Sequence, residues 1–152
     1  MSLLPSSELV AVAWLTGVSG LPSTAVGTTL PKDTSAWADT GFVQVGVVGG
    51  TPDADVPVAR PVMDVRCWAV RPGSAKPPWG KANQLAEVIR AACYRGEDDA
   101  EPFQRVVTLP AGYRQARVLS VYWVTEPRRL PSDEARFACY GGDLQIHWTA
   151  EP

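Results

Sequence analysis

The segment from Pro61 to Gly96 constrains the fold most, because it reads as a strand, a loop and an amphipathic helix in direct succession. Apolar side chains occupy every second position of residues 61–70, as in a strand with one buried face. Residues 71–80 contain three prolines and are expected to form a loop. Residues 81–94 then carry apolar side chains at helical spacing, and the predicted buried stripe comprises Ala82, Leu85, Ala86, Ile89 and Cys93.

A first helix is predicted near the N-terminus, over residues 7–16. Ser6 or Ser7 can cap its free backbone N–H groups, and Glu8 suits the positively polarised first turn. Gly17 follows its end, as Gly96 follows the end of the second helix. These two segments are the helices that we expect in the chain.

Alternating apolar residues predict strands at 42–48, 117–125 and 137–148, in addition to 61–70. Residues 25–30 and 104–109 are candidates for shorter strands. Gly141 and Gly142 mark either a bulge within one long strand or a two-residue hairpin turn. The bulge is the preferred interpretation, because the preceding strand is long enough to pair with all of 137–148.

A chain of 152 residues is long enough for one domain with a substantial core and short for two. The predicted order of helix, two strands, helix and further strands is typical of an α+β fold. We therefore expect a single domain over residues 1–152. It should contain an antiparallel or mixed sheet of about four to five strands, with two helices packed on one face of the sheet.

Charge and motifs argue against several functional classes. The net charge is −2 and the most basic local run, Pro127 to Arg129, is short, so no basic field favours nucleic-acid binding. Cys67, Cys93 and Cys139 lie far apart, which argues against zinc and for buried thiols in a reducing cytosol. We find no phosphate-binding glycine motif or EF-hand loop, and we expect no signal peptide or membrane span. The sequence implies neither a metal nor a cofactor.

One catalytic arrangement is conceivable in the last predicted strand. His147 is the single histidine, and Asp143 and Cys139 lie four and eight residues before it, so the three side chains could share a strand face. A Cys-His-Asp site would need all three within hydrogen-bond reach. No nucleophile motif surrounds Cys139, and a buried cysteine beside a surface or interface histidine is the preferred interpretation.

Residues that could contact a partner lie in two loops and on one strand face. Residues 49–60 and 71–79 are the longest insertions between regular elements, and loops on a rigid scaffold often carry recognition. Tryptophan is enriched at interfaces as well as in cores, so both alternatives stay open for those in loops. The candidate interface residues are Trp37, Thr51, Asp53, Asp55, Arg60, Arg66, Trp68, Arg71 and Trp79.

Several tracts resemble the tail terminator family of siphophages, the bacteriophages with long non-contractile tails. The helix at 82–94, with its small and aliphatic stripe, and the closing tract from Tyr140 to Ile146 carry most of the resemblance. The N-terminal helix, the strand at 42–48 and the final antiparallel strands occur in the order of that family. The resemblance covers most of the chain as a pattern of order and hydrophobicity.

The resemblance implies a structural protein of the virion, without catalytic residues. Tail terminators form a hexameric ring on the finished tail tube, stop its polymerisation and join the tail to the head connector. The implied partners are further copies of the chain, the tail tube protein and a head-completion or connector protein. Genomic DNA would pass through the lumen without sequence-specific binding, and no membrane is involved. The expected location is the tail or neck of the virion, and the host cytoplasm during assembly.

Three alternatives to a tail terminator stay open. A head-completion or head–tail adaptor protein of the same phage neck has similar size and also forms rings. A small cytosolic enzyme would use Cys139 and His147. A monomeric binding module would show no self-association.

Overall fold

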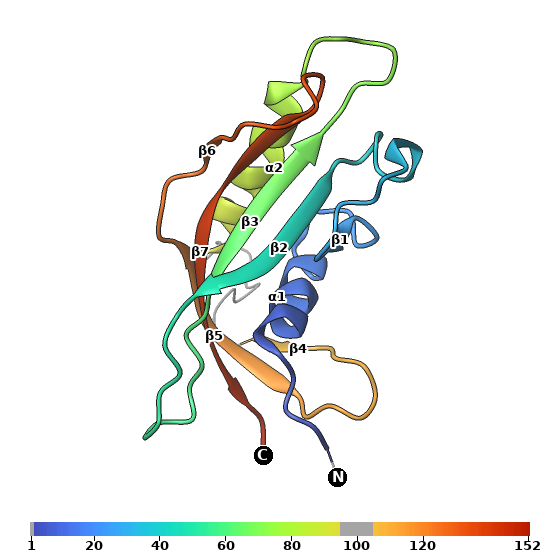
Figure 1. Ribbon diagram of the computed structural model, residues 1–152. Helices are drawn as coiled ribbons and strands as arrows, with labels where there is room; N and C mark the ends of the chain where they lie inside the picture. The colour runs from blue at the N-terminus through green and yellow to red at the C-terminus, as the bar shows by residue number, and fades with distance from the viewer. Residues whose placement is uncertain (1, 95–104) are drawn as a thin grey trace.

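The computed structural model describes residues 2–94 and 105–152, which form two α-helices and a seven-stranded sheet (Figure 1). The elements are α1 (Ser7–Thr16), β1 (Val26–Gly27), a short 3₁₀ helix (Thr34–Ala36), β2 (Phe42–Gly49), β3 (Val62–Ala69), α2 (Trp79–Ala92), β4 (Arg105–Val107), β5 (Ala116–Trp123), β6 (Arg128–Arg129) and β7 (Ala138–Ala150). The prediction of an α+β fold is confirmed. Strands β1 and β4 lie within the candidate short strands at 25–30 and 104–109, which are therefore confirmed. The sheet still has more strands than the four to five expected, because the two-residue strand β6 leaves no alternating pattern in the sequence.

The 13-residue strand β7 organises the sheet. One edge of β7 pairs with β3 over its first half, and the opposite edge pairs first with β6 and then with β5. The strand order is β1-β2-β3-β7-β5-β4, and β6 pairs with β7 outside this path. The pairing of β1 with β2 is parallel and the other pairings are antiparallel, so the sheet is mixed. It curls strongly into a half-barrel (Figure 1).

The two helices begin and end close to the predicted residues. The bounds predicted for α1 are confirmed, and its N-cap is Ser6, whose side-chain oxygen accepts a hydrogen bond from the backbone N–H of Leu9 at 3.2 Å. Helix α2 begins at Trp79 rather than Lys81, directly after two prolines, and ends at Ala92. Proline fits the start of a helix because its ring fixes φ and its nitrogen carries no hydrogen. In the described part of the chain, neither helix is long and apolar enough to span a bilayer.

Both helices pack on the same face of the sheet and share one hydrophobic core. Helix α1 contributes Val10 and Trp14, and helix α2 contributes Leu85 and Ile89, all of them buried. The strands meet these helices with the side chains that alternate onto the inner face, namely Val43, Val45, Met63, Val65, Cys67, Leu144 and Ile146. This arrangement is the one that the alternating and helical patterns predict.

A second, smaller core covers part of the outer face of the sheet. Trp37 from the segment before β2 is 1% exposed and Trp68 from β3 is 8% exposed, and both pack with Phe42 and Cys139. The rings of Trp37 and Phe137 meet edge to face with centroids 5.4 Å apart. In the described fold these two side chains are therefore part of a core and leave little surface for contact with a partner. Their own chain already covers them.

Gly141 and Gly142 lie inside β7, which is one continuous strand as predicted. The register with β3 runs through them without a shift, so the predicted bulge is absent there. Register shifts occur instead in β5, between Val118 and Ser120, and in β2 near its end. A Cβ atom on Gly142 would lie 2.9 Å from the carbonyl oxygen of Thr125. The two glycines are needed because other backbone segments approach β7 closely, not because the strand bends there.

Candidate functional site

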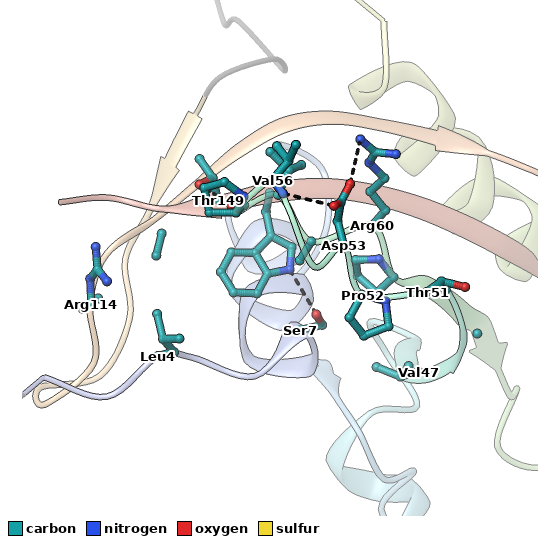
Figure 2. A pocket seen from close by; sticks show the side chains of 18 of the residues that line it. Leu4, Ser7, Val47, Thr51, Pro52, Asp53, Val56, Arg60, Arg114 and Thr149 are labelled. Carbon is teal, nitrogen blue, oxygen red and sulfur yellow. Dashed lines mark hydrogen bonds and ion pairs between the residues drawn. The ribbon is translucent and has the colours of Figure 1, made fainter.

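A groove of about 720 Å³ lies beside the loop that joins β2 and β3. Figure 2 shows this groove from close by, with the loop residues and the N-terminal segment around it. The groove is lined mainly by apolar side chains from Leu4, the end of β2, the loop and the last residues of β7. Four of the predicted contact residues line or border it, Thr51, Asp53, Asp55 and Arg60. The loop that the sequence singles out by its length therefore borders this groove, and its role in contacts stays a prediction.

The floor of the groove is the indole of Trp148 on β7, which is 7% exposed. Its Nε1–H donates a hydrogen bond to the hydroxyl of Ser7 at 3.1 Å, shown as a dashed line in Figure 2. Ser7 is the first residue of α1, so this bond joins the start of the chain to its last strand. A buried indole N–H without a partner would be destabilising, and Ser7 removes that penalty. The groove therefore rests on a rigid base.

Asp53 holds the tip of the loop in one conformation. Its Oδ1 accepts hydrogen bonds from the backbone N–H groups of Asp55 at 2.9 Å and Val56 at 3.0 Å. Its Oδ2 lies 3.7 Å from the guanidinium of Arg60 across the loop. The two backbone N–H groups, and then Arg60, hold the pKa of the Asp53 carboxyl below its ordinary value. Asp53 therefore acts as an internal brace of the loop in this fold.

The second half of the loop is tied to the final strand. Ala59 and Trp148 exchange two backbone hydrogen bonds, of 2.8 and 3.0 Å. The side chain of Gln145 donates to the carbonyl oxygen of Arg60 at 2.7 Å, and the hydroxyl of Thr149 donates to that of Pro57 at 2.8 Å. Residues 57–61 thus behave as an extension of the sheet, while residues 51–57 stay exposed. In Figure 1 the loop extends away from the body of the protein at the lower left.

The rim of the groove exposes large apolar side chains. Leu4 is 64% exposed, Val47 is 46% exposed and Val56 is 45% exposed. They come from three separate segments and line one hollow, which distinguishes them from apolar residues scattered singly over a surface. Leu4 and Val47 are not among the predicted contact residues. Val47 belongs to the alternating apolar set of its strand, and nothing local in the sequence indicates that the strand extends past the helices that cover this set.

The other predicted contact residues lie away from the groove. Arg66 on the outer face of β3 is half-exposed and pairs with Asp64 at 2.9 Å. Arg71 is exposed in the loop after β3, at the opposite end of that strand. Trp79, expected in this loop, is instead the first residue of α2, half-buried beneath the guanidinium of Arg129 at 4.7 Å. The structure therefore distributes the predicted residues over both ends of β3 and its outer face and does not join them in one site.

The arrangement of Cys139 and His147 does not resemble a catalytic pair. Eight residues separate them on one continuous strand, which corresponds to roughly 26 Å at the rise of an extended chain. Cys139 is fully buried, and burial raises the pKa of its thiol to about 12. Partial burial, and then the charge of Arg60, lowers the pKa of the imidazole of His147. The hydrogen-bond contact that the enzyme alternative requires is therefore absent between these two residues.

The remaining thiols and acids form no site either. Burial raises the pKa of Cys93 to about 12 and raises that of Cys67 as well. Within residues 2–94 and 105–152, no three His, Cys, Asp or Glu side chains gather closely enough to hold a metal ion. The predicted acidic loop at 97–101 lies outside the described residues.

Comparisons with known proteins identify no family. No family model matches the chain, and no curated protein matches it. One solved structure, of a protein that bears no functional name, aligns over 97% of this chain and 96% of its own, with a TM-score of 0.42 and 12% sequence identity.

Proposed function

We propose that this protein is a tail terminator of a siphophage, a structural protein that assembles as a ring of six identical subunits on the end of the tail tube. Such a ring ends polymerisation of the tube and joins it to the head connector, so its place is the tail or neck of the virion. The proposal starts from the resemblance of the helix at 82–94 and of the tract from Tyr140 to Ile146. It needs a surface that binds protein and involves no catalytic chemistry.

The observation that carries the proposal furthest is the exposed apolar groove beside a braced loop. A ring requires a head-to-tail contact, in which one patch of each subunit meets a different patch of its neighbour. Such contacts have an apolar centre with a polar rim. Leu4, Val47 and Val56 supply apolar contact area, while Asp53 and Arg60 supply charge at the edge. The preformed loop lowers the entropy that association would otherwise lose.

Native mass spectrometry at several concentrations, with and without tail tube protein, tests the proposed function directly. A hexamer, or a monomer that becomes one when tube protein is added, supports a tail terminator. A ring of twelve subunits would favour the head-completion alternative. A strict monomer that ignores tube protein would overturn the proposal.

A second measurement tests the groove as the contact between subunits. Val56→Asp places a charge at the exposed tip of the loop, outside the core, so we expect unchanged folding and a loss of the ring. The control Val124→Asp changes a valine that is 52% exposed and does not line the groove. Equal loss of the ring in both variants would contradict the role of the groove, and circular dichroism of each variant checks that it is folded.

Shortening the loop is a further test of its role in assembly, and the hydrogen bonds of the loop limit which residues can be removed. Removing residues 51–59 would break the bonds that tie Pro57 and Ala59 to β7. Shortening within residues 51–55 keeps those bonds and removes the exposed tip. We expect this deletion to leave the fold intact and to abolish assembly, whereas an unfolded variant would show that the tip has a structural role.

A further inference from the structure

The charges of this chain are strongly segregated, although its net charge is only −2. Residues 71–81 and 128–136 together carry six Lys and Arg against two Asp and Glu. The rest of the chain carries eight Lys and Arg against fourteen Asp and Glu. A fold that brings these two segments together would therefore build a basic surface on an acidic protein.

The fold does bring the two segments together. Strand β6 pairs with β7, so that Arg129 lies opposite Tyr140, and the guanidinium of Arg129 stacks on the ring of Trp79 at 4.7 Å. The rings of Trp79 and Tyr140 in turn meet edge to face at 6.3 Å. Trp79 follows the 71–78 loop directly, and in Figure 1 this loop and the turn that enters β7 both lie at the top of the molecule. We call this surface the basic end.

Five cations of the basic end are available for a ligand. They are exposed and, within the described residues, none of them makes an ion pair with a carboxylate; the five are Arg71, Lys76, Lys81, Arg128 and Arg129. The sixth cation, Arg136, lies 4.0 Å from Glu134 and is partly neutralised by it. Asp133 is the other acid of the two segments. An excess of positive charge therefore remains.

We infer that the basic end binds the phosphate backbone of duplex DNA, without reading base sequence. A protein partner would need an apolar centre in its contact surface, but no large apolar side chain is exposed in residues 71–81 or 128–136. The phosphate backbone of DNA requires only cations on the surface of the protein. When these cations neutralise phosphates, counterions are released from the DNA, which favours binding. The inference rests on the proposed function for the source of the DNA, which would be the genome in the lumen of the ring. It differs from the expectation drawn from the net charge and the most basic local run, because the two basic segments come together only in the fold.

The test is fluorescence anisotropy with two labelled DNA duplexes of about 30 base pairs and unrelated sequence, titrated between about 50 and 200 mM salt. The triple variant Lys76→Gln, Lys81→Gln, Arg128→Gln changes exposed side chains outside the core. We expect its affinity at about 50 mM salt to fall at least tenfold for both duplexes. The slope of log affinity against log salt should become shallower by about 2.7 for each basic end in contact, since each phosphate contact contributes roughly 0.9.

A matched pair of single variants controls for net charge. Lys81→Gln lies in the basic end and Lys32→Gln lies outside it, and both lysines are exposed. The inference requires that Lys81→Gln weakens binding and that Lys32→Gln does not. Three results would overturn the inference: an equal loss of DNA affinity in both single variants, an unchanged DNA affinity in the triple variant, or binding of poly-glutamate in place of DNA. Native mass spectrometry of the same samples shows separately whether the ring forms, so failure of assembly is distinguishable from failure of DNA binding.

Discussion

The close approach of three strands at Gly141 leads to a quantitative prediction. A Cβ atom at this position would overlap the carbonyl oxygen of Val65 on β3, and would also lie 3.0 Å from Cδ1 of Leu130 and 3.2 Å from the Cα of Arg66. Two of these three atoms belong to the backbone of a paired strand, which cannot move aside as the end of a flexible side chain can. Gly141 does not have a positive φ, so space alone demands glycine here.

The expected cost of Gly141→Ala follows from this geometry. Overpacking a core usually costs about 1–3 kcal/mol, and the upper part of this range applies where backbone is displaced. For a protein of this size each 1 kcal/mol lowers Tm by roughly 2–4 °C. We therefore expect Gly141→Ala to lower Tm by roughly 6–12 °C. The variant should also weaken DNA binding, because β6 and the arginines on it pair with β7 at this point.

Two other glycines provide matched controls for the same change. Gly142→Ala would place its Cβ 2.9 Å from the carbonyl oxygen of Thr125 and 3.0 Å from the hydroxyl oxygen of the same residue. The hydroxyl can rotate away, so this substitution should lower Tm by less than Gly141→Ala does. Gly80, in the first turn of α2, has no atom within 4 Å of the new methyl group. Alanine favours the helix by up to about 1 kcal/mol there, so Tm should not fall. Differential scanning calorimetry gives the Tm of each of the three variants, and we expect Gly141→Ala to have the lowest. A Gly141→Ala protein with the same Tm as Gly80→Ala would refute the packing argument.

Three further predictions concern buried groups. Ser7→Ala removes the hydrogen-bond partner of the Trp148 indole and should cost about 1–2 kcal/mol in urea denaturation, with the m-value unchanged. The thiols should react slowly with a disulfide reagent at pH 8 in the folded protein and fast in urea, because burial raises the pKa of all three; fast reaction of one thiol in the folded state would revive the enzyme alternative. The pKa of His147 is lowered in the folded state, so the unfolded chain binds more protons and Tm should fall as the pH drops through the ordinary value near 6.5. His147→Gln should reduce this fall.

The sequence predicted those elements whose stability comes from their own pattern. Helix α1 and strands β2, β3 and β7 each have a periodic apolar face, and their bounds agree with the prediction to within two residues at each end. Strand β1 lies within the candidate strand at 25–30 but is shorter than it, and β6 was not predicted; each spans two residues and pairs with one neighbouring strand. Local sequence rules predict a β-bulge at Gly141 and Gly142. Glycine is instead required at these two positions because segments distant in sequence lie too close for a side chain.

Only those parts of the candidate site that have a local signal in the sequence were predicted. The loop at 49–60 stands out by its length, and the structure places a groove beside it. The tryptophans were ambiguous because their chemistry suits both cores and interfaces, and only the tertiary fold shows that Trp37 and Trp68 are buried. The basic end could not be seen because its two segments lie about 50 residues apart and meet only through β6 and Trp79.

The groove and the basic end lie at opposite ends of β3, which separates them by roughly 23 Å along the strand. Changes at the two ends should therefore act independently on the stability of the fold, since they share no contact. If both proposals hold, binding to DNA should nevertheless depend on both ends, because the proposed ring would present several basic ends to one duplex and gain affinity from their effective concentration. We expect Val56→Asp to lower the apparent affinity for DNA and to reduce the salt slope to that of a single subunit, while the triple variant keeps the ring. The contrary result is that Val56→Asp prevents ring assembly and leaves the slope of log affinity against log salt unchanged. In that case the basic ends do not contact a common duplex, and ring assembly and DNA binding are independent properties of this protein.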